Sequence, residues 1–199
     1  MIEVLVALLL LSFTLLGIAG LLGATTKYQI GVESRSITTL FFTDLTSRLR
    51  SNLPNVPGYD VTNSTPAYVY TATWASQQGT IAAASTNCGP VETTSIPVTP
   101  SVCTSAQRAA FDLWETRSTV RRSLPQGSFL LAGDTTNGVT VTYMWFDKDY
   151  LTGTNPPTLQ QSAICSATTT REMRQSCCPA AAAVGTTPGV RCLNLTFVP

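Results

Sequence analysis

Six cysteines are the side chains of this sequence most suited to form covalent cross-links or to bind zinc, since the chain contains no histidine. Without imidazole, the commonest general base and every histidine-containing metal site are excluded. The cysteines are Cys88, Cys103, Cys165, Cys177, Cys178 and Cys192. A zinc site made of cysteines alone usually needs two C-x2-4-C pairs, and none occurs here. An even number of cysteines after a hydrophobic segment instead indicates disulfides formed in an oxidising compartment.

The pairing of these cysteines is not fixed by the sequence, because six cysteines allow many sets of three disulfides. Cys177 and Cys178 are adjacent, and a bond between neighbours requires a strained ring, so we expect them to have different partners. Pairing within local loops gives Cys88–Cys103, Cys165–Cys177 and Cys178–Cys192. Each bridge would contribute about 2–4 kcal/mol to stability.

Other chemistry has little support in the sequence. No G-x-S-x-G nucleophile motif or phosphate-binding loop is present. Charged residues make up 12% of the 199-residue chain and the net charge is +1, which argues against a nucleic-acid partner. We therefore expect no catalytic residue, no metal, no cofactor and no small-molecule substrate.

Glu3 is the one charged residue at the start of a long apolar segment, Val4–Ala24, which has no charge. A helix of that length is about 30 Å long and matches the hydrocarbon core of a bilayer. A cleaved signal peptide would begin with basic residues and end at a small-residue cleavage site, and this segment has neither. A single-pass anchor is the simplest alternative. An ionisable residue beside such a helix is a functional candidate by default.

Three glycines, Gly17, Gly20 and Gly23, follow one another at intervals of three residues in the same segment. Small residues at this spacing allow close approach of helices within a membrane. They also weaken a helix by up to about 1 kcal/mol each relative to alanine. We expect them to provide helix packing or flexibility.

The first ten residues, MIEVLVALLL, closely resemble the N-terminus of type IV pilins and pseudopilins. In that family a prepilin peptidase cuts after a glycine, and a glutamate occupies the fifth mature position of a hydrophobic helix. If Glu3 is that glutamate, two mature residues and a short basic leader precede Met1. The resemblance implies that Glu3 pairs with the N-terminal ammonium of a neighbouring subunit and sets the axial register of packed helices. The region around Gly20 carries a proline in many major pilins.

The helical pattern continues beyond the apolar segment as far as Asn52. Pro54, Pro57 and Gly58 then end it. A single stripe is formed by Ile37, Leu40, Phe41, Leu45 and Leu49. We expect three parts: residues 1–27 as the transmembrane or filament-core half of the helix, 28–53 as its amphipathic half, and 54–199 as a globular periplasmic head.

The head contains patterns of both strands and a helix. We expect a strand over 68–74, an amphipathic helix over 105–124 that Pro125 stops, two strands over 128–133 and 139–146, and a last strand over 190–198. Asn137-Gly138 is a strong signal for a hairpin turn between the middle two strands. The fold class is therefore α+β.

A second resemblance lies between Phe111 and Asp149. PilV-type minor pilins have a D-L-x-x-W helix that ends in L-P-x-G and is followed by a T-V-x-x-x-W strand. The matching residues here are Asp112, Leu113, Trp114, Leu124, Pro125, Gly127 and Trp145. We expect them to cap the helix or fill the core and to perform no chemistry. The stretch Thr14–Leu21, TLLGIAGL, also resembles PilV-type minor pilins.

Together the resemblances imply a type IV pilin fold, with a long N-terminal helix packed on an antiparallel sheet and loops held by disulfides. They imply a minor pilin that primes pilus assembly and sits in a tip complex, supporting twitching motility, adhesion or DNA uptake. Its partners would be other minor pilins, the major pilin and a tip adhesin, and before assembly the bacterial inner membrane. The first alternative is a type II secretion pseudopilin. A calcium-binding acidic loop would favour it, but the only acidic cluster, Asp147-Lys148-Asp149, is thin. The second alternative is a monomeric membrane-anchored periplasmic binding module.

Overall fold

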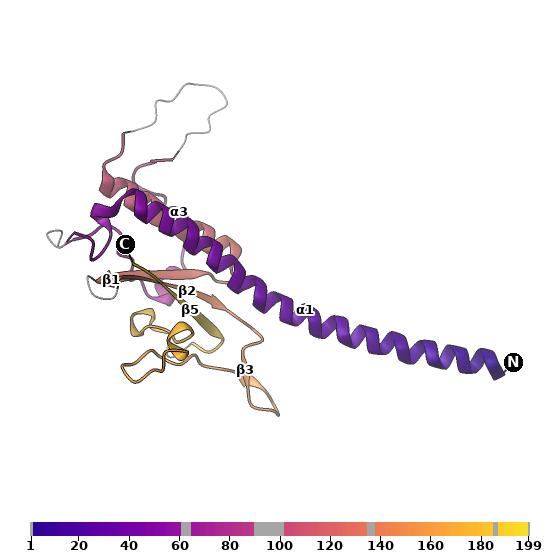
Figure 1. Ribbon diagram of the computed structural model, residues 1–199. Helices are drawn as coiled ribbons and strands as arrows, with labels where there is room; N and C mark the ends of the chain where they lie inside the picture. The colour runs from indigo at the N-terminus through magenta and orange to yellow at the C-terminus, as the bar shows by residue number, and fades with distance from the viewer. Residues whose placement is uncertain (1, 61–64, 90–101, 135–137, 185–186, 199) are drawn as a thin grey trace, which may run out of the picture. The chain divides into compact units, whose positions relative to one another are not determined.

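One helix, α1, forms the first quarter of the chain in a computed structural model that describes residues 2–60, 65–89, 102–134, 138–184 and 187–198 (Figure 1). It spans Ile2–Ser51, 50 residues, which is about 75 Å at 1.5 Å per residue. A single 3₁₀ turn, η1 (Leu53–Asn55), follows it and contains Pro54, which cannot donate a helical hydrogen bond. The predicted long N-terminal helix is thus confirmed, with its end one residue before Asn52.

The chain divides into two units, Met1–Ile37 and Thr38–Pro199. The described part of the first unit is the N-terminal portion of α1, whose apolar side chains from Ile2 to Leu22 are exposed on all sides. The second unit begins with the last turns of α1. There Thr38, Leu45 and Leu49 are fully buried. The expected stripe was wrong at Leu40, which is 66% exposed; the buried stripe passes instead through Thr38, on the side of the helix that also carries Leu45 and Leu49.

The other elements all belong to the second unit. They are α2 (Trp74–Gln77), α3 (Ser105–Ser123), β1 (Ser128–Asp134), β2 (Gly138–Phe146), β3 (Leu151–Thr152), β4 (Thr158–Leu159), η2 (Met173–Gln175), η3 (Ala180–Ala182) and β5 (Val190–Phe197). Helix α3 begins with a capping box between Thr104 and Gln107 and ends just before Leu124 and Pro125. The predicted helix over 105–124 is confirmed.

A three-stranded antiparallel sheet in the order β1-β2-β5 forms the centre of this unit, and β3 pairs with β4 in a small separate hairpin. The predicted strands over 128–133, 139–146 and 190–198 are confirmed within one residue at each end. Of the predicted turn, Asn137 lies outside the described residues. Gly138 has φ +74°, and a Cβ there would lie 2.6 Å from the carbonyl oxygen of Phe197, so this position requires glycine.

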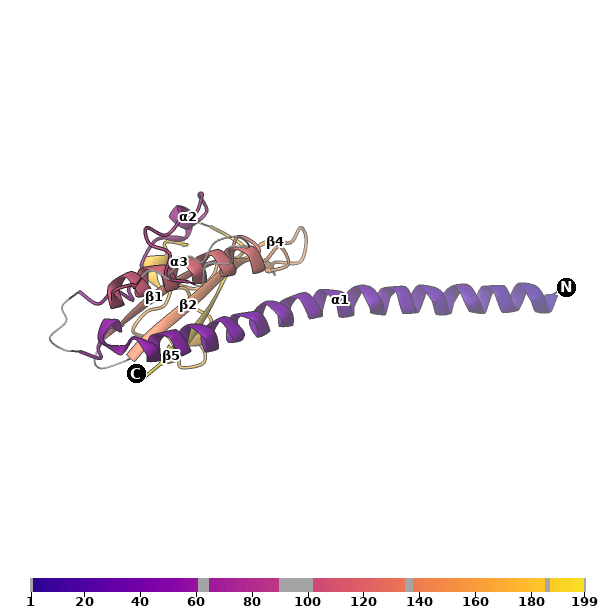
Figure 2. The same cartoon turned by 90° about the horizontal axis from the view of Figure 1, so that it is seen from above.

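The sheet has a different layer on each face. In Figure 1 the C-terminal turns of α1 and helix α3 lie on one side of the sheet, and Figure 2 shows the same elements from above. On that face the rings of Phe41 and Tyr143 lie 6.3 Å apart, and the Arg50 guanidinium lies 5.2 Å from the ring centre of Phe197. The opposite face is covered by α2 and the C-terminal loops, which form a buried cluster: Trp74, Leu130, Met144, Cys178, Ala182, Val184, Val190 and Cys192.

The predicted strand over 68–74 was wrong for most of its length. Tyr70 makes a single antiparallel bridge to Leu131, and Trp74 already belongs to α2. The reason is local, because the Thr73 side chain accepts a hydrogen bond from the Ser76 N–H and thereby caps a helical turn. The structure is therefore α+β, with a long N-terminal helix, an antiparallel sheet and three disulfides.

Candidate functional site

Glu3 lies in the first turn of α1, in the unit Met1–Ile37. Its neighbours along the helix, Val4 and Leu5, are more than 60% exposed. Within the part of the chain that the structure describes, Glu3 makes no ion pair, and α1 is the one helix long and apolar enough to cross a membrane. Among the described residues, the Glu3 carboxylate therefore lies exposed on an apolar helix.

Gly17, Gly20 and Gly23 lie inside α1, which is continuous through them. Apart from the neighbouring backbone of the helix itself, a Cβ at any of the three would have no atom of the described residues within 4 Å. No contact among the described residues therefore requires these glycines. Their small size leaves a strip of helix backbone that another helix can approach closely. That the helix loosens here in an assembled fibre stays a prediction.

Four charged side chains and one tyrosine of the second unit form a group that we call the Arg48 network. It consists of Asp44, Arg48, Tyr68, Asp112 and Glu115. Arg48 donates to Asp44 Oδ2 at 2.9 Å, to Asp112 Oδ1 at 3.1 Å and to Glu115. The Tyr68 hydroxyl donates to the second oxygen of Asp112, which is 4% exposed. The network therefore joins the end of α1 to the middle of α3 and to the segment before α2.

The environment of the network shifts two ionisation equilibria. Burial lowers the pKa of Arg48, but its hydrogen bond to Glu115 and the charge of Asp44 outweigh that effect and raise this pKa above its ordinary value. Burial, followed by the hydrogen bond to Asp112, raises the pKa of Tyr68 above its ordinary range. A permanently charged guanidinium and a protonated phenol that both serve one carboxylate make a structural link, with no acid or base ready for proton transfer.

This finding corrects one interpretation of Asp112. As part of the D-L-x-x-W motif it was expected to cap the helix, but the cap is Thr104 and Asp112 lies two turns further along α3. The expectation that motif residues fill the core is confirmed for Leu113 and Trp145, which are buried. The pairing of Asp112 with Arg48 spans 64 residues of sequence, and no local pattern could have revealed it.

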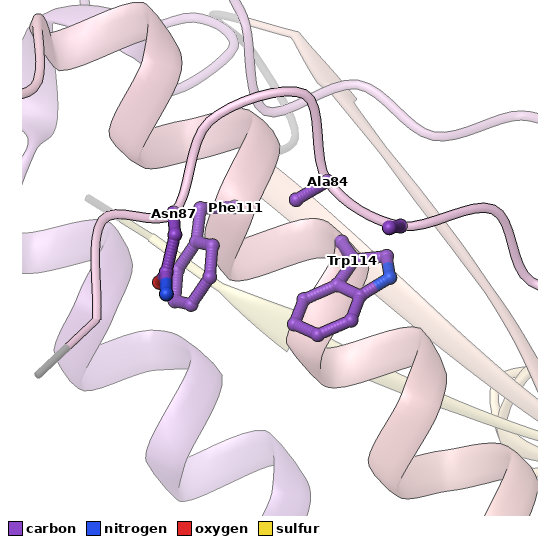
Figure 3. A pocket seen from close by; sticks show the side chains of 5 residues that line it. Ala84, Asn87, Phe111 and Trp114 are labelled. Carbon is purple, nitrogen blue, oxygen red and sulfur yellow. The ribbon is translucent and has the colours of Figure 1, made fainter. Parts of the chain in front are cut away.

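A cavity of about 350 Å³ lies against α3, between Phe111, Trp114 and the segment that carries Ala83, Ala84 and Asn87. Figure 3 shows the two aromatic side chains rising from the helix toward that segment. Their ring centroids lie 5.5 Å apart and their planes are tilted by 38°. Among the described residues, no ionisable group lines the cavity, so this lining is suited to a small apolar or aromatic group.

The three disulfides cross-link two parts of the head. They join Cys88 to Cys103, Cys165 to Cys177 and Cys178 to Cys192, which is the pairing that local loops favour. Cys178 and Cys192 are both buried against the sheet, and Ile164 forms a bridge with Cys178. The Asn194 amide also donates to the carbonyl oxygens of Arg174 and Cys177 at 2.6 and 2.8 Å. The C-terminal loops are thus fixed to β5 by a covalent bond and by hydrogen bonds.

Within the described ranges, no group of three or more His, Cys, Asp or Glu side chains is arranged to hold a metal ion. Asp147, which belongs to the thin acidic cluster of the sequence, pairs with Arg191 at 3.0 Å. Comparison with known proteins found no matching protein-family model, no matching curated protein and no matching solved structure. Function is therefore inferred from the residues and geometry of this chain and from its sequence resemblances.

Proposed function

We propose that this protein is a minor pilin of a type IV pilus, an assembly subunit of the PilV type and not an enzyme. Before assembly, α1 anchors it in the bacterial inner membrane with the head in the periplasm. After assembly it belongs to the surface pilus, in a tip complex with other minor pilins that primes growth of the fibre. It thereby supports twitching motility, adhesion or DNA uptake.

The observation that carries the proposal is Glu3 on a helix that is apolar and exposed all round. A helix that served only as an anchor would gain nothing from a carboxylate at this position, because an ionised group in an apolar environment costs several kcal/mol when it is unpaired. The cost is removed when a cation from a neighbouring subunit pairs with it. Such a pairing acts at one height along the helix and so fixes the axial stagger of adjacent subunits.

The organisation of the head supports the same proposal. The helix is one continuous element from Ile2 to Ser51, and its last turns form part of the core of the second unit. The Arg48 network ties those turns to α3 by charged hydrogen bonds. The end of the helix is therefore held in the head by the buried Leu45 and Leu49 and by charged hydrogen bonds to α3. A filament subunit under load requires such an attachment.

Incorporation into pili tests the proposal. The wild-type precursor and Glu3→Leu are compared in sheared surface pili and in the inner membrane. Ser12→Leu is the matched control, because it also replaces a polar residue of the apolar helix by leucine, and the Ser12 hydroxyl only donates to its own helix at Leu9 O. We expect wild type and Ser12→Leu in pili at low stoichiometry, and Glu3→Leu in the membrane alone.

A second candidate function is a membrane-anchored periplasmic binding module, which the cavity between Phe111 and Trp114 favours. The same experiment separates the two. If Glu3→Leu behaves as wild type, and a strain without the protein makes normal pili, the filament role is wrong and the cavity becomes the site to screen.

A further inference from the structure

The two edges of the central sheet differ. At the β1 edge, Tyr70 exchanges both backbone hydrogen bonds with Leu131, each 2.8 Å long, so that edge is covered by the chain itself. The other edge is β5, which pairs with β2 on one side. The direction in which each backbone group of β5 points follows from the register of the sheet.

In an antiparallel sheet, a residue directs its N–H and C=O toward one neighbouring strand, and the next residue directs them toward the other. Leu131 bonds to Tyr70, so its backbone points away from β2 and its partner Val141 points toward β5. Val141 is paired with Leu195. It follows that Leu195 bonds to β2, whereas Asn194 and Thr196 direct their N–H and C=O groups outward.

An independent contact checks this assignment. Val190 lies an even number of residues from Asn194, so its backbone N–H and C=O must also point outward. Its carbonyl oxygen accepts a hydrogen bond from the Ser162 hydroxyl, which lies outside the sheet. Cys192, in the same set, is 5% exposed and lies under the loop that its disulfide holds. The open part of the edge therefore begins at Asn194.

We define the β5 edge as the backbone N–H and C=O groups of Asn194 and Thr196. Within the described residues, no donor or acceptor reaches any of these four groups. Thr196 is exposed, and Val198 just beyond the strand is 76% exposed. The Asn194 side chain is already occupied by Arg174 and Cys177, so it does not fold back over the edge.

Proteins usually protect such an edge with a proline, a lysine, a bulge or a covering segment. Strand β5 reads VRCLNLTF and has neither proline nor lysine. Its register with β2 runs residue for residue from Val190 to Phe197 without a bulge. Its one charge, Arg191, lies at the covered end of the strand and pairs with Asp147. An edge whose backbone groups have no partner among the described residues is a template for another strand.

We propose that the β5 edge binds an extended segment of another polypeptide, which adds to the three-stranded sheet beside β5. Backbone donors and acceptors at this spacing are complementary to an extended chain and to nothing smaller. The faces of β5 define the segment further. Leu193, Leu195 and Phe197 lie on the helix-covered face, and Asn194 and Thr196 lie on the other. The segment therefore alternates apolar and polar residues. A binding module would use the same edge, so this binding does not depend on the filament role.

The probe for the test is a synthetic peptide with the sequence of Val139–Tyr143, VTVTY, because β2 already pairs with β5 through this alternation. It is titrated into the full chain in detergent micelles and followed by NMR. We expect the amides of Asn194 and Thr196 to gain protection from hydrogen exchange, whereas those of Leu193 and Leu195, already bonded to β2, stay as they were. A VTPTY peptide, which lacks the central N–H, is the peptide control.

Thr196→Pro and Thr196→Ala form the matched pair of variants. Proline removes the outward N–H and leaves the bonds to β2 intact, whereas alanine keeps that N–H. We expect thermal unfolding of both to resemble wild type, and peptide binding to weaken about tenfold or more for proline and to stay within about twofold for alanine. Equal binding by the two variants, or uniform protection along β5, overturns the proposal. So does self-association of the chain through β5 in sedimentation equilibrium, since a second copy would then be the occupant.

Discussion

Asp112 accepts one hydrogen bond from a guanidinium and another from a phenol, and each bond comes from a distant part of the chain. A carboxylate that is 4% exposed has lost most of its hydration, so its partners must replace it. The two ends of the Tyr68–Asp112 bond therefore differ in what their loss costs. Removing the Asp112 carboxylate ends both bonds, whereas removing the Tyr68 hydroxyl ends one and leaves Asp112 paired with Arg48.

Substitutions in the Arg48 network test this asymmetry. We expect Asp112→Ala to lower the free energy of unfolding by about 2–3 kcal/mol, since it orphans the Tyr68 hydroxyl and removes a charged bond. Tyr68→Phe should cost about 1 kcal/mol. Urea unfolding of the full chain in detergent measures both. The double variant should cost less than the two single effects added together, because they share one bond. Strict additivity would contradict a shared bond.

Tyr143 gives a prediction of opposite sign. Its side chain is fully buried, and its hydroxyl has no hydrogen-bond partner in the described part of the chain. An unsatisfied buried hydroxyl costs about 1–3 kcal/mol. We therefore expect Tyr143→Phe to leave the stability at neutral pH unchanged or to raise it, as measured by the midpoint of urea unfolding. A clear loss of stability would mean that the hydroxyl has a partner in solution.

The same two tyrosines predict how stability depends on alkaline pH. Burial raises the pKa of Tyr68 and of Tyr143 above their ordinary values, so the folded state keeps both protons after the unfolded state has lost them. The stability linked to them is fully present below the unfolded-state pKa of about 10 and is lost as the pH rises toward the folded-state values. Unfolding midpoints should therefore fall above about pH 10, and less steeply in Tyr143→Phe. Equal slopes would contradict the shift for this residue.

At the scale of elements, two disulfides of similar loop length differ in where they lie. The Cys88–Cys103 and Cys178–Cys192 bridges close loops of 15 and 14 residues, so the loop-entropy contribution is about 3 kcal/mol for each. Cys178 and Cys192, however, belong to the buried cluster on the sheet. We expect the double alanine replacement of Cys178 and Cys192 to lower the thermal midpoint more than that of Cys88 and Cys103. Equal losses would show that chain entropy alone accounts for both bridges.

The elements that the sequence predicted well are those with both a periodic pattern and a stop signal. Helix α3 is bounded by Pro125, and α1 by Pro54, and both ends were found within a residue or two. Tyr68–Trp74 was misread because its β-branched and aromatic residues suggest a strand, whereas the Thr73 cap favours a turn of helix. Leu40 was wrongly assigned to the buried stripe, because the sequence alone does not distinguish an apolar residue within the stripe from one beside it.

The candidate sites were less predictable than the elements. Glu3 and the glycines could be named as candidates from the sequence, because the argument for them depends only on their positions along one helix; their roles stay predictions. The Arg48 network and the cavity at Phe111 and Trp114 require pairings between segments that are far apart in sequence, such as Arg48 with Asp112. Such pairings depend on how the helices cross the sheet, which local spacing does not encode. The open edge at Asn194 and Thr196 likewise depends on the register of all three strands, because that register decides which backbone groups of β5 point outward.

At the scale of the whole molecule, the division between Ile37 and Thr38 predicts that the second unit, Thr38–Pro199, is an autonomous folding unit. We expect a chain of residues 38–199, exported behind a signal peptide, to be soluble and to contain all three disulfides. Mass spectrometry before and after reduction counts the bridges, and thermal unfolding should give a midpoint within a few degrees of the full chain in detergent. Aggregation or incomplete oxidation would show that the helix before Thr38 is needed for folding.

The adjacent cysteines Cys177 and Cys178 have a consequence for how the protein matures. Exchanging their partners would change each loop by one residue, and the entropy of closing a loop hardly depends on so small a change. While the chain is still open, correct and crossed bridges therefore form with nearly equal ease. Only the completed sheet distinguishes them, when Cys178 enters its buried cluster beside Cys192. The yield of mature protein should then depend on a thiol–disulfide isomerase that can undo the crossed pair, so the capacity of a cell to correct errors would limit how much of this subunit it can supply.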